Sequence, residues 1–203
     1  MIAHHFTTPI TTPFARKSTQ VYGDLRRFWE KEKIKESAQK PEIAGFCRLI
    51  KGYKIMIKIL FVCHGNICRS PMAEFVFNDL AQRQHFPAHA DSCATSAEEI
   101  GREIHSDTRR TLHAHGVPFS PRAARQLCRA DYAAYDHLIA MDEANVRHIL
   151  RITGGDPQGK VHKLLSFAGS ARDVADPWYT GDFETTYADV HCGCESLLRA
   201  LKK

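Results

Sequence analysis

The chain has 203 residues, 43% of them apolar and 25% charged, a composition typical of a globular domain. Its formal charge of +5 is unevenly placed: residues 1–55 hold 11 basic and 5 acidic side chains, whereas residues 56–203 hold 17 and 18. The near-neutral larger part argues against a nucleic-acid-binding protein. No run of about 18 apolar residues is present, so no membrane span is expected.

The N-terminal segment differs from the rest of the chain. Residues 1–20 are rich in Thr and Pro without periodicity, which predicts disorder, and the apolar spacing from Val21 to Trp29 predicts one short helix. We therefore expect residues 1–55 to be an extension and residues 56–203 to be the folded domain. The start lacks the apolar core of a secretion signal, so the seven irregularly spaced cysteines are expected to be reduced thiols in the cytoplasm.

Strand-like and helix-like segments alternate from Ile57 onward. Four strands are predicted, at "IKILFVC" (57–63), "HADSCATS" (89–96), "HLIAMD" (137–142) and "KVHKLLSF" (160–167). Helices are predicted from an N-cap and first residue at Ser70 and Pro71, between Ser106 and Gly116, at "EANVRHIL" (143–150), and along 183–201. This order predicts an α/β fold with three layers, α/β/α, around a four-stranded parallel sheet. Ligands bind such sheets at the carboxyl ends of the strands.

The segment "CHGNICRSP" (63–71) lies at such an end, between the first strand and the first helix. Gly65 and Asn66 tolerate a positive φ, so the loop can turn its backbone N–H groups inward around an anion. Arg69 adds a planar fork for two phosphate oxygens, and this positive field favours the thiolate of Cys63. Ser70 can donate a hydrogen bond to that thiolate. The pattern predicts a phosphate loop whose nucleophile is Cys63.

A thiolate that attacks a phosphate ester needs an acid to protonate the leaving oxygen. Asp176, in "DPWY" (176–179), is the candidate acid. Trp178 and Tyr179 follow it and offer apolar walls for a flat aromatic substrate.

The two motifs together resemble those of the low-molecular-weight protein tyrosine phosphatases of bacterial type. The resemblance also covers "DSCATSAEEIG" (91–101) and "MDEANVRHI" (141–149), and so spans residues 56–203. It implies that Cys63 forms a phosphocysteine, that Arg69 clamps the phosphate, and that Asp176 acts first as acid and then as base. It implies phosphotyrosine-containing protein substrates, no metal and no organic cofactor; we also expect a monomer.

The resemblance assigns further residues to the loop and to substrate binding. Asn66 is expected to hold the strained loop, with Ser70 and Ser96 hydrogen-bonding around it, and Cys68 is expected to be able to form a protective disulfide with the nucleophile. The full set is His64, Gly65, Asn66, Ile67, Cys68, Ser70, Ser96, Trp178 and Tyr179. Glu98 stands where the family usually has an aromatic residue on the pocket rim, which predicts a preference against acidic flanking sequences.

Three other functions compete with this one. Arginine phosphatases of the family carry Thr where this chain has Ile67, so tyrosine is the predicted substrate residue. Thioredoxin-coupled arsenate reductases need two further cysteines after the third strand, whereas Cys192 and Cys194 fall on the predicted C-terminal helix. A phosphopeptide-binding module would be expected to lack the nucleophile or the acid.

Overall fold

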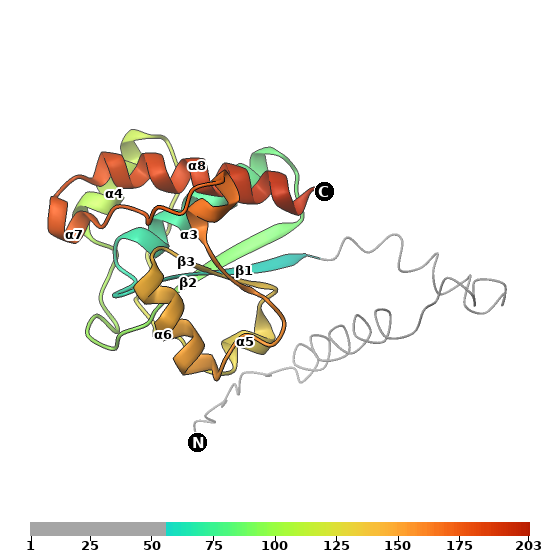
Figure 1. Cartoon of the computed structure of the whole chain (residues 1–203). Coiled ribbons are helices and arrows are strands. Elements are labelled where there is room, and N and C mark those ends of the chain that lie inside the picture. The colour runs from blue at the N-terminus through green and yellow to red at the C-terminus, as the bar shows by residue number, and fades with distance from the viewer. Residues whose placement is uncertain (1–55) are drawn as a thin grey trace, which may run out of the picture. The chain divides into compact units, whose positions relative to one another are not determined.

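A four-stranded parallel sheet forms the centre of the domain, as predicted (Figure 1). The computed structural model describes residues 56–203, so the predictions for residues 1–55 lie outside the described part. The strands are β1 (Ile57–Cys63), β2 (Ala88–Ala94), β3 (His137–Ala140) and β4 (Val161–Lys163), in the spatial order β2-β1-β3-β4. β1 is central, paired along its whole length with β2 and from Ile59 with β3. Its carboxyl end, at Cys63, therefore opens between two other strand ends.

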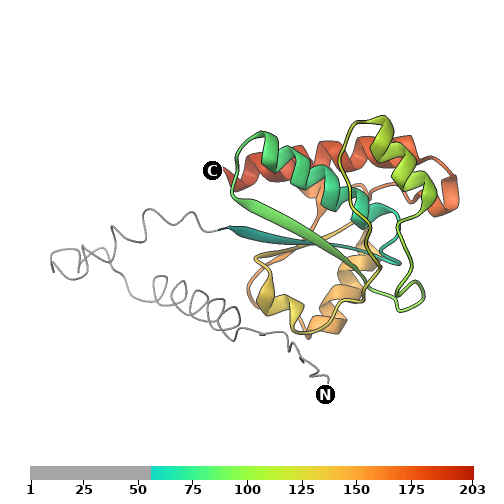
Figure 2. The same cartoon turned by 180° about the vertical axis from the view of Figure 1, so that it is seen from behind.

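Helices cover both faces of this sheet. They are α3 (Arg69–Arg83), α4 (Ser106–Ala114), α5 (Asp131–Ala134), α6 (Glu143–Thr153), α7 (Pro177–Thr180) and α8 (Phe183–Leu201), with a 3₁₀ helix η1 (Leu164–Ala168). In Figures 1 and 2, α3, α4 and α8 lie on one face, and α5 and α6 lie on the other. None of the helices within residues 56–203 combines the length and apolar composition that a bilayer crossing requires.

The alternation of side chains along β1 divides the core into two clusters. Ile59 and Phe61 point toward α3 and α8, and the ring of Phe61 packs edge-on against Phe77 of α3 at 5.9 Å. Leu60 and Val62 point the opposite way, into a cluster with Ile149 of α6. All four β1 side chains are fully buried. Burial on both faces fixes the register of the strand, and with it the position of Cys63.

The first helix begins two residues earlier than predicted. α3 starts at Arg69, with Cys68 in the N-cap position and no side-chain cap, so the assignment of Ser70 as N-cap is wrong. The Ser70 hydroxyl is instead bound to the Cys63 thiol. Pro71 sits in the first turn, where a missing N–H costs no intrahelical bond.

Other predicted boundaries also move. β2 ends at Ala94 and β3 at Ala140, each two residues before the predicted end, and α6 continues to Thr153. The ring of His105, not Ser106, caps α4 by accepting a hydrogen bond from the N–H of Asp107. The fourth strand ends at Lys163, because the chain coils into η1 and both Leu164 and Leu165 enter the core.

Candidate active site

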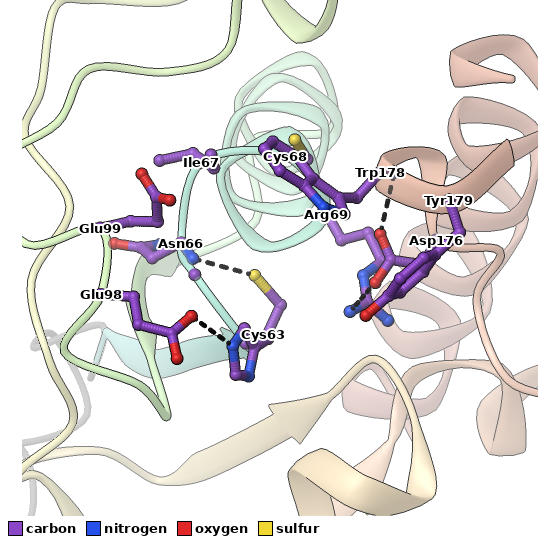
Figure 3. A pocket seen from close by; sticks show the side chains of 12 residues that line it. Cys63, Asn66, Ile67, Cys68, Arg69, Glu98, Glu99, Asp176, Trp178 and Tyr179 are labelled. Carbon is purple, nitrogen blue, oxygen red and sulfur yellow. Dashed lines mark hydrogen bonds and ion pairs between the residues drawn. The ribbon is translucent and has the colours of Figure 1, made fainter. Parts of the chain in front are cut away.

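The loop between β1 and α3 forms the floor of a pocket at the carboxyl ends of the strands (Figure 3). Side chains from three separated segments line this pocket: Cys63, His64, Gly65, Asn66, Ile67, Cys68, Arg69, Glu98, Glu99, Asp176, Trp178 and Tyr179. The predicted nucleophile, phosphate clamp and acid therefore share one cavity, although Asp176 is distant from the loop in sequence.

Cys63 is held by two hydrogen bonds at the base of the pocket. Its Sγ lies 3.0 Å from the Ser70 hydroxyl, the predicted partner. The backbone N–H of Asn66 donates to the same sulfur at 3.2 Å. The two contacts fix the position of the sulfur at the start of the loop. Only 3% of the residue is exposed, so a reactant reaches the sulfur only through the pocket.

Asn66 holds the turn of the loop. Its φ of 60° lies in the left-handed region, as predicted. Its side-chain amide donates to Ser70 at 2.9 Å and to Ser92 at 2.8 Å. The amide oxygen accepts from the Arg122 guanidinium at 2.7 Å and from the Arg125 N–H at 3.2 Å. The strained residue is thus fixed by four hydrogen bonds from its side chain.

Gly65 has a different role from the one predicted. Its φ is not positive; the prediction that it supplies a left-handed angle is wrong. A Cβ at this position would lie 3.1 Å from Cγ of Glu99, tighter than ordinary packing. The glycine instead allows the segment that carries Glu99 to approach the loop closely.

A network behind the loop was not found from the sequence. Arg122 pairs with Glu74 of α3 at 2.6 Å and also hydrogen-bonds the hydroxyl and the carbonyl oxygen of Ser92, at 3.0 Å for the carbonyl. The Ser92 hydroxyl donates to Glu74 at 2.7 Å. The hydrogen bond to the side chain of Asn66 that was expected from Ser96 is therefore made by Ser92. The Ser96 hydroxyl accepts from the N–H of Glu98 instead. Ser96 contacts the loop through its backbone, which donates to the carbonyl of His64 at 3.0 Å.

Arg69 is buried and pairs with two carboxylates. One guanidinium nitrogen lies 2.6 Å from Asp142, and the other lies 2.5 Å from Asp176. Burial lowers the pKa of Arg69, but Cys63, Asp176 and Asp142 together raise it further than burial lowers it. Asp142 also caps α6 by accepting from the N–H of Asn145 at 2.6 Å. The sequence analysis missed Asp142, although it follows the third strand at the edge where the site was expected.

Aromatic and acidic side chains form opposite sides of the pocket. In Figure 3, Trp178 and Tyr179 lie on the same side as Asp176, whose carboxylate caps α7 by accepting from the Trp178 N–H at 3.1 Å. Both aromatic residues are largely exposed, at 62% and 85%. Glu98 and Glu99 lie on the facing side. The mouth therefore offers apolar surface on one side and negative charge on the other.

Three other predicted residues complete the loop. His64 pairs with Glu98 at 3.1 Å on the exposed rim. Ile67 is mostly buried and packs with Ala124, leaving a small part in the pocket. Cys68 is a free thiol; burial and the neighbouring Cys63 raise its pKa to about 12. Within residues 56–203, no group of three or more His, Cys, Asp or Glu side chains is placed to hold a metal ion.

Known proteins of one family are similar to this chain. Residues 58–203 match the family described as low molecular weight phosphotyrosine protein phosphatase. The chain belongs to this family. The low molecular weight protein-tyrosine-phosphatase YfkJ of Bacillus subtilis is 38% identical over 152 residues, which cover 73% of this chain and 97% of YfkJ. PtpA of Staphylococcus aureus, strain Newman, is 35% identical over 150 residues, covering 73% and 96%.

Solved structures of the family have the same fold. The crystal structure of YfkJ superposes with a TM-score of 0.71 over 74% of this chain and 98% of that one. SP-PTP, the low molecular weight protein tyrosine phosphatase of Streptococcus pyogenes, superposes with a TM-score of 0.66 at 36% identity, covering 72% and 93%. The predicted fold class is confirmed, and the enzyme is a protein-tyrosine-phosphatase, a hydrolase.

Proposed function

We propose that the enzyme hydrolyses phosphotyrosine in proteins, and aryl phosphates, through a phosphocysteine at Cys63. One observation carries this proposal: Cys63, Arg69 and Asp176 meet in one pocket at the end of β1. Their residue types match the three needs of the reaction, a nucleophile, a charge clamp and an acid.

In the first step, the Cys63 thiolate donates an electron pair to phosphorus and forms an S–P bond. The P–O bond to the tyrosine ring breaks, and its electrons pass to the phenolic oxygen. The carboxyl group of Asp176 gives that oxygen its proton, so the leaving group departs as neutral phenol. Arg69 binds two phosphate oxygens and gives up its contact with Asp176 to do so.

In the second step, a water molecule attacks phosphorus while the Asp176 carboxylate accepts one of its protons. The P–S bond breaks, its electrons return to the sulfur, and inorganic phosphate leaves. The Ser70 hydroxyl, 3.0 Å from the sulfur, stabilises the departing thiolate. The inward-facing N–H of Asn66 contributes in the same way at 3.2 Å.

Three variants test these roles on aryl phosphate and on phosphotyrosine peptides. We expect Cys63→Ser to abolish turnover while it still binds inorganic phosphate in calorimetry. Arg69→Lys should be nearly as damaging, because an ammonium group cannot make the two-pronged contact. Asp176→Asn should lower kcat/KM by roughly 10²–10⁴-fold, the usual contribution of a general acid. Near-normal turnover by Cys63→Ser would contradict the covalent mechanism.

We propose tyrosine rather than arginine as the dephosphorylated residue. Ile67 has no hydroxyl to orient attack on a P–N bond, and Trp178 and Tyr179 offer aromatic surface to a phenol ring, where such pairs add about 0.5–1.5 kcal/mol. Glu98 and Glu99 are the features that would attract a guanidinium. The test compares kcat/KM on phosphotyrosine and phosphoarginine peptides, and Ile67→Thr is expected to shift the ratio toward phosphoarginine. A wild-type preference for phosphoarginine would overturn the choice.

The remaining expectations follow from the same chemistry. A free thiol nucleophile works in a reducing compartment, which supports a cytoplasmic location. The exposed carboxylate of Glu98 is expected to disfavour acidic residues beside the phosphotyrosine, since like charges repel across the rim. An arsenate reductase remains the weaker alternative, because both cysteines of the C-terminal segment lie on α8 and Cys194 is fully buried.

A further inference from the structure

The residue before Asp176 is held by side chains of α8. The N–H of Ala175 donates to Oδ2 of Asp189 at 3.1 Å, and its carbonyl oxygen accepts from the hydroxyl of Thr186 at 2.9 Å. Thr186 is fully buried, and Asp189 is 6% exposed. Both backbone polar groups of Ala175 are therefore bound by a helix that contributes nothing to the pocket lining.

Asp189 is itself held rigidly. Two guanidinium nitrogens of Arg172 donate hydrogen bonds to the two carboxylate oxygens of Asp189, at 2.7 Å and 2.6 Å. The N–H of Val174 donates to the carbonyl of Met141, just past β3, at 2.9 Å. The segment that leads to Asp176 is thus tied to α8 on one side and to the sheet on the other.

Beyond Asp176 the anchoring is weaker. Pro177 is buried, but Trp178 and Tyr179 are the most exposed large hydrophobic residues of the described part. The carboxylate itself contacts Arg69 and the N–H of Trp178. In the proposed mechanism Arg69 binds the phosphate instead. The contact between Arg69 and Asp176 is therefore lost when substrate binds. The fixed backbone at Ala175 then remains to set where the carboxyl group points.

We propose that Thr186 and Asp189 are positioning residues that aim Asp176 at the leaving oxygen. The inference rests on the proposed role of Asp176 as general acid. Displacing a reacting group by about 1 Å can cost two orders of magnitude in rate, so loss of one anchor should be measurable in catalysis.

The leaving group distinguishes positioning from a general loss of structure. Phenyl phosphate has a poor leaving group that needs the proton from Asp176, whereas 2,4-dinitrophenyl phosphate releases an anion that hardly needs one. A mispositioned acid therefore slows the first substrate and spares the second. The parameter to follow is kcat/KM, because it reports the steps up to P–O cleavage.

The main variant is Thr186→Val, which keeps the shape and removes the hydroxyl. We expect its kcat/KM to fall about tenfold on phenyl phosphate and less than about twofold on 2,4-dinitrophenyl phosphate. Thr186→Ser, which restores the donor, should recover wild-type values on both. Asp189→Ala should repeat the selective loss, because it removes the oxygen that accepts from both Arg172 and the Ala175 N–H.

The control is Thr153→Val on α6, another buried threonine, whose hydroxyl binds the carbonyl of Ile149 at 2.8 Å. This variant also loses a buried hydrogen bond from a threonine hydroxyl, but one that is not connected to Asp176. It should therefore lower the thermal midpoint without changing the ratio of kcat/KM between the two substrates. Equal losses on both substrates in Thr186→Val, or no loss on either, would overturn the positioning role.

Asp176→Asn, measured beside these variants, separates the two proposals. If it shows the selective loss and Thr186→Val does not, only the positioning inference is overturned. If it shows no selectivity itself, the assignment of Asp176 as acid fails, and the inference that depends on it falls as well.

Discussion

Cys63 and Cys68 share one loop but have different chemistry. Both are buried free thiols, yet burial and the proximity of Cys63 raise the pKa of Cys68 to about 12. Cys68 therefore stays protonated at neutral pH, while the sulfur of Cys63 lies at the base of the pocket with Ser70 and the Asn66 N–H as hydrogen-bond partners. An oxidant that enters the pocket is expected to react at Cys63 first, and to give a sulfenic acid.

This difference leads to a prediction about recovery from peroxide. The Cys68 thiol should condense with the sulfenic acid, releasing water and forming a disulfide that thiols can reduce. Wild-type enzyme should regain activity after dithiothreitol, whereas Cys68→Ser should stay inactive because its nucleophile is oxidised further. Cys128→Ser, which removes an exposed thiol, is the control and should recover like wild type. Full recovery by Cys68→Ser would leave Cys68 as a buried loop residue only.

Single residues were predictable where their chemistry shows in local sequence. Asn66 could be expected in the left-handed region because few other side chains tolerate it. The contact of Arg122 with Asn66 could not be predicted, because the two residues are 56 positions apart. Nothing in the sequence around Arg122 distinguishes it from an ordinary surface arginine. The contact of Asp142 with Arg69 could not be predicted either, because it depends on how β1 and β3 pair.

At the scale of elements, the sequence predicted the four strands and the four longest helices, but not the short helices α5, α7 and η1, nor where side chains would shift a boundary. The hydroxyl of Ser70 left its expected capping role because Cys63 and Asn66 bind it. The helix α8 was correctly predicted, with both ends, because the helical periodicity of its apolar residues persists over all 19 residues. The close approach of that helix to η1 was not predicted, because the periodicity does not show which face meets Leu164.

Gly193 marks that approach and supports a prediction about stability. A Cβ there would lie 2.5 Å from Cγ of Leu164, which is itself fully buried. Glycine to alanine normally stabilises a helix by about 0.5–1 kcal/mol, but overpacking a core costs about 1–3 kcal/mol. We expect Gly193→Ala to lower the free energy of unfolding in urea titrations. The exposed neighbour Cys192→Ala should change it little, and a stabilised Gly193→Ala would show that the helix shifts freely away from η1.

At the scale of the molecule, the strands, the two core clusters and every residue of the pocket come from the described part of the chain. The family match spans the same region, residues 58–203. Alternating strands and helices were enough to predict this architecture, because a parallel sheet needs a helical crossover between its strands. The order β2-β1-β3-β4 then places the loop after β1 near the middle of the edge where ligands bind.

The same reasoning predicts the effect of removing residues 1–55. An enzyme that begins at Met56 should keep its thermal midpoint within about 2 °C and its kcat/KM on aryl phosphate within about twofold, because the alternating strands and helices of the α/β pattern begin at Ile57 and the family match begins at residue 58. Its charge should change most, since residues 56–203 hold 17 basic and 18 acidic side chains against +5 for the whole chain. Retention on a cation exchanger at pH 7 should therefore fall. A midpoint lowered by more than about 5 °C, or loss of solubility, would show that the segment stabilises the domain and would contradict the division at residue 56.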